Sequence, residues 1–199
     1  MSKLQKAALR SLHPTQLTVG MIVVHDKKKH LGQMTAAQQQ EFLQAHPMPA
    51  VLGPKGTLYI TDHHHLGRAA IESGIDSAFV CVEENLSSHD DTAHFWKEMN
   101  KSLWVHPLDA NGVRHYYTTI PEHLDKLVDD PYRSLAGYVR DAGGYDKTPT
   151  AFAEFIWADF FRRNVPVEDL HSDFKAAVQA AIPLAQSHIA KGIPGFKAK

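Results

Sequence analysis

An aspartate followed by three consecutive histidines constrains the fold of this chain more than any other feature. The four residues are Asp62, His63, His64 and His65. They follow a short apolar stretch, residues 57–61, and precede a stretch from Leu66 onward in which apolar residues recur at helical spacing. Gly74 ends this predicted helix, and a second apolar strand, residues 77–82, comes next. The sequence therefore predicts a strand, a polar turn, a helix and a strand, with the turn where α/β proteins bind ligands.

The residue types at this turn suit an anion such as phosphate. The N-terminus of a helix offers backbone N–H groups and a partial positive charge, and Arg68 follows one turn later. Arg68 and His65 could then hold one phosphate, while one imidazole acts as an acid or base and Asp62 fixes the tautomer of another. Two structural alternatives stand beside this hypothesis: Arg68 pairs with Glu72 at i+4, and His64 points inward as a packed polar residue.

The histidines could instead bind a metal ion such as Zn²⁺. Adjacent residues of a turn point in different directions, so only His63 and His65 are expected to share a face. Asp62, His106 and Asp159 are available as further ligands, but no closed zinc spacing pattern selects among them. The identity of any metal ligand therefore stays open in the sequence.

The stretch of residues 62–74, DHHHLGRAAIESG, resembles the second sequence box of the ParB/sulfiredoxin superfamily, whose members carry Gly-x-x-Arg or Asp-Gly-His-His-Arg here. Further segments resemble the ParB-like branch that is labelled as a nuclease family. They are Pro14-Thr15-Gln16, Val19-Gly20, Val24 with Lys27, His46-Pro47, and residues 104–107, 130–137 and 154–160. The resemblance runs from about residue 9 to residue 163 and so covers most of the chain.

The resemblance implies an α+β fold, in which a small mixed sheet with helices is followed by a helical C-terminal part. Members of the superfamily bind and hydrolyse CTP at centromeres, use ATP to repair oxidised cysteine, or phosphorylate free serine. A nucleotide (ATP, ADP or CTP) with Mg²⁺ is therefore the ligand that the resemblance suggests. This chain departs from several relatives, since a third histidine stands where they have glycine and the arginine is displaced to Arg68. Its one cysteine, Cys81, lies in an apolar strand pattern, which makes sulfiredoxin chemistry the poorest fit.

Four candidate ligand-binding residues lie outside the histidine turn, in segments that carry the resemblance. They are Gln16, Lys27, Tyr132 and Arg133. Lys27 would counter the charge of a phosphate group. Tyr132 and Arg133 follow an Asp-Pro pair that suits a helix start, and they could read a base by stacking and a phosphate by charge. Core packing is the alternative for Tyr132.

A predicted helix over residues 150–162 carries two lines of side chains. The first is an apolar stripe typical of a core, made of Phe152, Phe155, Ile156 and Phe160. The second is made of Glu154, Trp157 and Phe161. If the second line faces a pocket, Glu154 is a candidate base and Trp157 a stacking platform; otherwise Glu154 is solvated. Asp159 could pair with Arg163 at i+4.

The charge balance bears on the class of partner. The 199 residues carry a formal net charge of −1, which argues against duplex DNA as the main partner because phosphate neutralisation supplies most of the affinity for DNA. A basic run at residues 27–30 is the local exception, and such a run is most often solvated surface. No apolar stretch is long enough to span a membrane, no signal peptide is visible, and a single cysteine fits a reducing compartment. The cytoplasm is therefore expected, and the oligomeric state stays open.

The remaining patterns predict how the chain is divided. A strand is expected over residues 16–24, and Thr35 is expected to N-cap a helix that ends at Ala45. The series after residue 120 looks helical, at about residues 121–128, 132–142, 150–162 and 168–190. These patterns predict an α+β domain over residues 1–118 and a helical domain over residues 119–199 that packs on it.

Three classes of function follow from these observations. The first is binding of a nucleotide or phosphorylated small molecule at the histidine turn, with hydrolysis or transfer of a phosphoryl group. The second is a DNA-binding protein or metal-dependent nuclease, and the third is a non-catalytic ligand-binding or scaffold protein. Acidic residues are mixed among the basic ones after residue 121, which favours the small ligand over DNA. The sequence leaves open whether the protein is an enzyme.

Overall fold

The computed structural model describes residues 3–88 and 91–198, which form two compact units. The first unit comprises Val24–Asp109, Val113–Val128 and the described residues up to Val19. The second comprises Gly20–Val23, Ala110–Gly112 and the described residues from Asp129 on. The first unit thus extends to Val128, past residue 118, where the sequence suggests a division.

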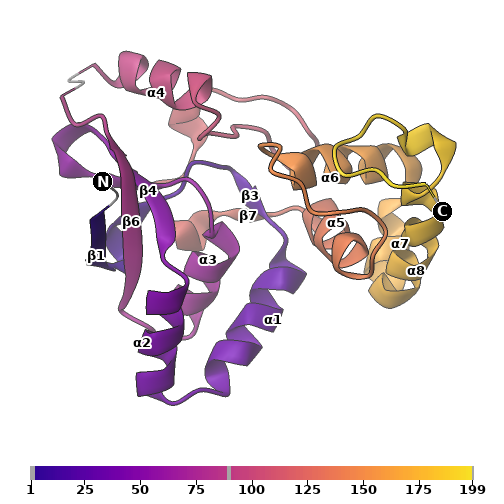
Figure 1. Ribbon diagram of the computed structural model, residues 1–199, viewed down its shortest axis with the longest axis horizontal. Helices are drawn as coiled ribbons and strands as arrows, with labels where there is room; N and C mark the ends of the chain where they lie inside the picture. The colour runs from indigo at the N-terminus through magenta and orange to yellow at the C-terminus, as the bar shows by residue number, and fades with distance from the viewer. Residues whose placement is uncertain (1–2, 89–90, 199) are drawn as a thin grey trace. The chain divides into compact units, whose positions relative to one another are not determined.

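A five-stranded mixed sheet forms the centre of the first unit (Figure 1). Its strands, in spatial order, are β1 (Lys3–Ala8), β6 (Ser77–Asn85), β4 (Met48–Leu52), β5 (Leu58–Ile60) and β2 (Leu12–His13). The pairs β1–β6 and β4–β5 are antiparallel, whereas β4–β6 and β2–β5 are parallel. A separate two-stranded sheet pairs β3 (Thr18–Val19) with β7 (Val128–Asp129). The small mixed sheet expected from the sequence is confirmed.

Four α-helices accompany the sheet in sequence. They are α1 (Met21–Gly32), α2 (Ala36–Ala45), α3 (His64–Glu72) and α4 (Thr92–Lys101). The first unit also contains short 3₁₀ helices: η1 (Leu9–Ser11) between β1 and β2, η2 (Pro54–Gly56) between β4 and β5, and η3 (Tyr117–Thr119) and η4 (Leu124–Lys126) between α4 and β7. Thr35 caps α2 with a reciprocal capping box to Gln38, so the predicted start and end of this helix are confirmed.

The strand expected over residues 16–24 is wrong, because β3 ends at Val19 and α1 begins at Met21. Of the β-branched residues that suggested a strand, Thr18 and Val19 form β3, whereas Ile22 and Val23 stand in the first turn of α1. Val24 and Leu31, seven residues apart on one helix face, are both buried. Lys27 therefore projects from a helix, where it is half-buried.

The second unit is helical. It contains α5 (Pro131–Asp141), α6 (Ala153–Asn164), α7 (Val167–Ser172), α8 (Phe174–Ala185) and η5 (His188–Ala190). The predicted helices at 132–142 and 150–162 correspond to α5 and α6, but the stretch 168–190 is divided where Asp173 caps α8 by accepting from Ala176 N. The helix expected at 121–128 is wrong, since only η4 forms there before the chain extends into β7. Leu124 and Leu127 are buried, and their spacing of three suits a 3₁₀ turn as well as an α-helix.

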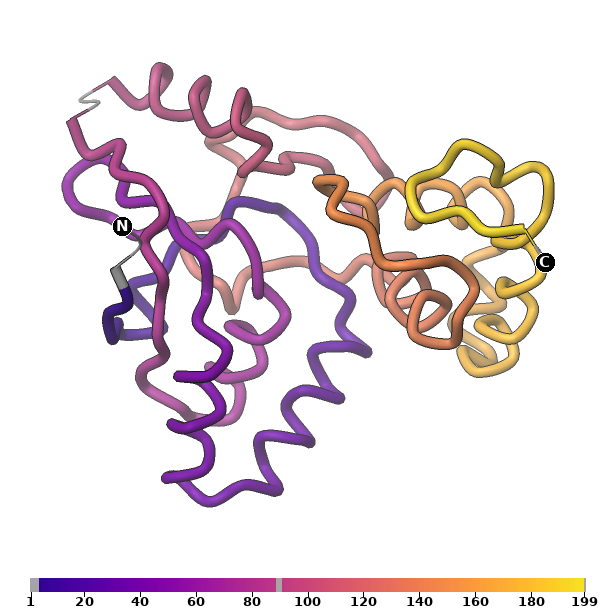
Figure 2. Tube along the Cα trace, viewed as in Figure 1, coloured from indigo at the N-terminus to yellow at the C-terminus, as the bar shows by residue number. Residues whose placement is uncertain are grey.

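The core of the second unit is built around Trp157. Its indole stacks on the Tyr145 ring, with centroids 4.1 Å apart, and packs against Phe160 and Phe161. Figure 2 follows the final segment of the chain, in yellow, back toward α6, where the Pro194 carbonyl accepts a hydrogen bond from Trp157 Nε1 at 2.8 Å. Among the described residues, no helix in either unit has the length and apolar character to cross a membrane.

His13, at the edge strand β2, gives the first unit an expected pH dependence. Its ring lies 5.3 Å from the Tyr59 ring and 6.3 Å from the His123 ring. Burial lowers the pKa of His13, Glu122 opposes that effect, and His123 adds to it. The unfolded chain therefore binds this proton more readily than the folded chain, and the free energy of unfolding is expected to fall as pH drops below about 6.5. The loss ends once the pH is below the lowered pKa.

Thermal unfolding of the intact chain, followed from about pH 7.5 to about pH 5, measures this effect. A His13→Gln variant is expected to lose part of the pH dependence. His171→Gln, which changes an exposed histidine of α7, is the control and is expected to keep it. An unchanged pH profile in His13→Gln would contradict the assignment.

Candidate functional site

The turn before α3 has an unusual backbone. His63 is the N-cap residue and adopts the left-handed conformation, with φ 64° and ψ 22°, which costs a non-glycine residue on the order of 1 kcal/mol. Asp62 supports this conformation by accepting a hydrogen bond from His63 N at 2.6 Å. The His63 side chain does not cap the helix, whereas Thr35, Asp91, Asp130 and Asp173 cap α2, α4, α5 and α8. The α3 N-terminus thus lacks the side-chain cap that these helices have.

His64 points inward and is buried. Its Nε2 accepts a hydrogen bond from Thr15 N at 3.1 Å, so the neutral ring carries its proton on Nδ1. Thr15 Oγ1 donates in turn to the Ile60 carbonyl at 2.9 Å. These bonds attach the segment after β2 to the start of α3. The alternative in which His64 is a packed polar residue is confirmed.

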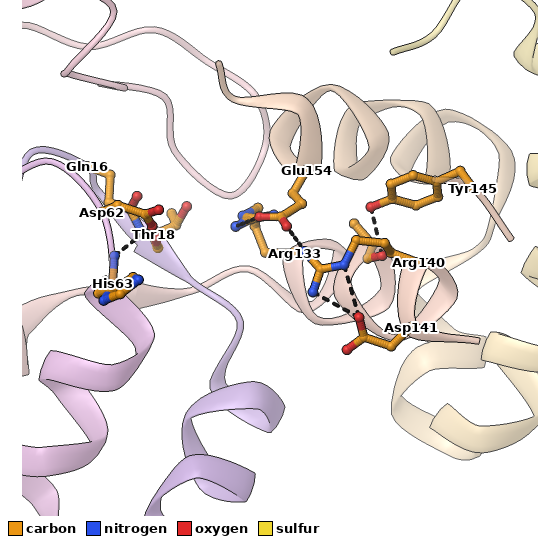
Figure 3. A network of polar contacts seen from close by, with 10 residues as sticks. Gln16, Thr18, Asp62, His63, Arg133, Arg140, Asp141, Tyr145 and Glu154 are labelled. Atoms are coloured by element: carbon orange, nitrogen blue, oxygen red, sulfur yellow. Dashed lines mark hydrogen bonds and ion pairs between the residues drawn. The ribbon is translucent and has the colours of Figure 1, made fainter. Parts of the chain in front are cut away.

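The segment attached in this way carries two further buried polar side chains, Gln16 and Thr18. Gln16 Nε2 donates to the Thr18 carbonyl at 2.7 Å. Figure 3 shows both side chains with Asp62 and His63 at the beginning of α3. The sequence pointed to Gln16 as a site residue but to Thr18 only as a β-branched residue of the predicted strand; its one further signal was a polar Thr-Gln-x-Thr run at the start of that strand.

Two buried atoms of this group have no hydrogen-bond partner among the described residues: Thr18 Oγ1 and His63 Nδ1. A buried donor or acceptor left unsatisfied costs about 1–3 kcal/mol. Native structures retain few such atoms without a reason, and a ligand that completes the bonds is one reason. We name Gln16, Thr18, Asp62 and His63 the α3 turn cluster.

Arg68 lies in the second turn of α3 and has partners within the protein. Its Nε donates to Glu72 Oε1 at 2.6 Å, and its Nη1 donates to the carbonyls of Leu127 at 3.2 Å and Leu124 at 3.4 Å. Burial pushes the pKa of Glu72 upward, but Arg68 and Lys28 together hold it below its ordinary value. The i+4 pairing raised as the alternative for Arg68 is confirmed, and the guanidinium anchors η4 to α3.

Two other predicted residues of the first unit, His65 and Lys27, lie on helices. His65 stands in the first turn of α3 and is half-buried. Lys27 stands in the second turn of α1, and within the described part of the chain no hydrogen bond or ion pair joins it to Asp62 or His63. Across residues 3–88 and 91–198, no three His, Cys, Asp or Glu side chains are grouped so as to hold a metal ion.

Glu154 belongs to a cluster of charges in the second unit, shown in Figure 3. Arg133 Nη2 lies 3.3 Å from Glu154 Oε2, and Arg140 Nη1 contacts Glu154 Oε1. The buried Arg133 guanidinium also lies over the Phe155 ring, 4.2 Å from its centroid. These contacts join α5 to α6, so Glu154 and Arg133 have a structural explanation beside their predicted roles.

The stacking roles predicted for Tyr132 and Trp157 are wrong, because both rings belong to the core of the second unit. Tyr132 is buried, and its hydroxyl donates to the Val165 carbonyl at 2.8 Å. Trp157 has no exposed surface. Core packing, the alternative given for Tyr132, is what the structure shows for both Tyr132 and Trp157. Ile156, expected in the core stripe, is exposed instead.

A buried ion pair that sequence reasoning missed joins Asp130 to Arg162. Their side chains are 2% and 17% exposed, and Arg162 Nη2 lies 2.6 Å from Asp130 Oδ2. Burial raises the pKa of Asp130, although Arg162 and the Tyr132 amide favour its charged form. Asp159 contacts Arg162 as well, so its pairing expected with Arg163 is wrong. The sequence identified Asp130 only as a helix cap, a role it also has.

Comparison with known proteins agrees with the sequence resemblance. Residues 5–163 match a protein family described as "Putative ParB-like nuclease". The crystal structure of protein Atu1540 from Agrobacterium tumefaciens is 36% identical in sequence, covers 99% of both chains and has a TM-score of 0.91. No curated protein matches the sequence. The chain therefore belongs to this ParB-like family.

Proposed function

We propose that the first unit binds the phosphate group of a nucleotide or phosphorylated small molecule at the α3 turn cluster. The observation that carries the proposal is the pair of buried atoms Thr18 Oγ1 and His63 Nδ1, for which residues 3–88 and 91–198 supply no hydrogen-bond partner. A hydroxyl and an imidazole N–H are both donors to phosphate oxygens. His63 is the N-cap residue of α3, where the backbone dipole favours an anion, and the Thr18 side chain is drawn beside it in Figure 3.

The charge of Asp62 bears on whether the bound phosphate carries a Mg²⁺ ion. Its side chain is exposed and negatively charged, and one of its oxygens already accepts from His63 N. A bare phosphate beside it meets repulsion, whereas a phosphate that carries Mg²⁺ does not. Mg²⁺ is commonly held by one or two carboxylates together with substrate phosphates, which a single aspartate at this position fits. The proposed ligand is therefore a Mg²⁺-bound nucleotide such as ATP, ADP or CTP.

The proposal extends to hydrolysis or transfer of a phosphoryl group. A histidine titrates near neutral pH, so His63 or His65 can protonate a leaving oxygen, and Gln16 can orient the attacking group. Arg68, Lys27, Glu154 and Arg133 are not needed for binding in this proposal. His64 acts indirectly, by fixing the segment that carries Gln16 and Thr18.

The family description favours a second candidate function, cleavage of a phosphodiester in nucleic acid. The chemistry at the α3 turn cluster would be shared, because the group recognised is again a phosphate. The net charge of −1 gives no general attraction to duplex DNA. A single-stranded oligonucleotide is therefore the appropriate substrate for testing this candidate.

Replacing Thr18 with valine tests the proposal with two opposite effects. Without ligand, the variant is expected to be more stable by about 1 kcal/mol, because a buried hydroxyl without a partner is removed. Its affinity for the Mg²⁺-nucleotide is expected to fall by about 10-fold to 100-fold, the value of one hydrogen bond to a charged group. Thermal unfolding with ATP, ADP, CTP, GTP or inorganic phosphate, with and without Mg²⁺, measures both.

Thr118→Val is the matched control, since Thr118 is exposed in η3 of the same unit. It is expected to change neither stability nor the ligand-induced shift. If no nucleotide stabilises the wild-type chain, the binding proposal fails and a scaffold is favoured. If an oligonucleotide stabilises it and nucleotides do not, the second candidate is favoured.

A further inference from the structure

A pocket of about 120 Å³ lies in the first unit, and none of its lining residues belongs to the α3 turn cluster. It is lined by Arg10, Ile71, His123, Asp125 and Lys126. Arg10 comes from η1, Ile71 from the last turn of α3, and the other three from the segment that contains η4. Three separate pieces of chain thus place their side chains around one cavity.

The charges around this pocket are unbalanced. Arg10 and Lys126 are cationic, and Asp125 is the one carboxylate among the lining residues. The Arg10 side chain is 78% exposed, and its Nη1 lies 3.9 Å from Asp125 Oδ2, a loose contact that leaves the guanidinium fork available. His123 adds an imidazole ring that can hydrogen-bond to an anion. The charges of Arg10, Lys126 and Asp125 sum to +1.

We propose that this pocket is a second anion site that binds a small phosphomonoester. Arg10 supplies bidentate donors, which match the geometry of a phosphate, and Lys126 supplies a point charge on the other side. Ile71 gives the pocket an apolar wall, which suits a short carbon group attached to the phosphate. A volume of about 120 Å³ accommodates a phosphate and a few carbon atoms.

Binding here acts on an element that the first unit uses to hold α3. Lys126 lies between Leu124 and Leu127, and the carbonyls of both accept hydrogen bonds from Arg68. An anion that bridges Lys126 and Arg10 fixes η4 to η1, and the Arg68 contacts then transmit that restraint to α3. This proposal is independent of the proposed function, because it uses none of the α3 turn cluster.

Titration with inorganic phosphate and with glycerol 3-phosphate, at constant ionic strength and followed by the imidazole proton resonances of His123, tests the site. The wild-type chain is expected to show a saturable shift of His123, with the phosphomonoester bound more tightly than phosphate. The double variant Arg10→Gln and Lys126→Gln is expected to bind at least about tenfold more weakly, since two charge-assisted contacts are removed.

The matched control is the double variant Lys29→Gln and Lys55→Gln, which removes the same charge from exposed residues of the first unit. It is expected to bind as the wild type does. Equal weakening in both double variants, or a His123 signal that does not move, would overturn the proposal. Thr18→Val separates the two sites: it is expected to leave the His123 titration unchanged whether or not the proposed function is correct.

Discussion

Replacing Asp130 with alanine is expected to destabilise the second unit by about 3–5 kcal/mol, the usual cost of removing one partner of a buried ion pair. Asp130 is almost fully buried and pairs with Arg162, whose guanidinium also lies 5.2 Å from the centre of the Tyr132 ring. The same carboxylate caps α5 by accepting from Tyr132 N at 3.0 Å. The substitution therefore removes a cap and leaves a largely buried cation whose remaining acidic partner, among the described residues, is Asp159.

Asparagine at position 130 separates the contribution of the ion pair with Arg162 from that of the N-cap of α5. Asp130→Asn keeps an N-cap acceptor and removes the charge, so the difference between the two variants reports the cap, worth about 1 kcal/mol. Asp141→Ala is the control, because Asp141 is exposed at the end of α5 and is expected to contribute less than about 1 kcal/mol. Chemical denaturation measures all three. A loss below about 1 kcal/mol in Asp130→Ala would contradict the role of the buried pair.

Trp157→Ala is expected to cost about 3–5 kcal/mol, because a fully buried indole leaves a large cavity. The variant loses the stack on Tyr145 and the hydrogen bond to the Pro194 carbonyl. Trp157→Phe keeps an aromatic ring in the core and loses the hydrogen bond and part of the packing, so its expected cost is smaller. This result would follow from packing alone and requires no ligand.

The nucleotide affinity of folded Trp157→Phe tests whether Trp157 packs in the core or stacks on a base. Since the indole is enclosed in the core, the variant is expected to bind as tightly as the wild type. Ile156→Ala, one residue away on the exposed face of α6, is the stability control and is expected to cost less than about 1 kcal/mol. Loss of nucleotide affinity in a folded Trp157→Phe protein would restore the stacking role.

Local signals in the sequence predicted much of the fold. Gly74, the N-cap residue Thr35 and the Asp-Pro start of α5 are short-range features, and each marks a helix end that the structure confirms. The errors arose where local signals were ambiguous. A run of β-branched residues after Gly20 suits a strand or a first helical turn equally well, and only burial of Val24 and Leu31 decides between them.

The candidate site was predictable only in part, because some of its features depend on contacts that local sequence patterns do not show. The histidine run itself located the start of α3, and the inward direction of His64 was one of the alternatives that it left open. The burial of Thr18 and the absence of a partner for its hydroxyl depend on contacts between residues distant in sequence. The same holds for Asp130 and Arg162, which are 32 positions apart. Trp157 was misassigned because a helical period shows which residues share a face but not whether that face meets a core or a ligand.

The most direct test of the central claim is an NMR titration of the wild-type chain with Mg²⁺-ATP and Mg²⁺-CTP, observed at the imidazole of His63. We expect a saturable shift of the His63 resonances for at least one nucleotide, with an affinity at least about tenfold weaker in Thr18→Val and unchanged in Thr118→Val. Nucleotide binding that leaves His63 unperturbed, or that Thr18→Val does not weaken, would contradict it.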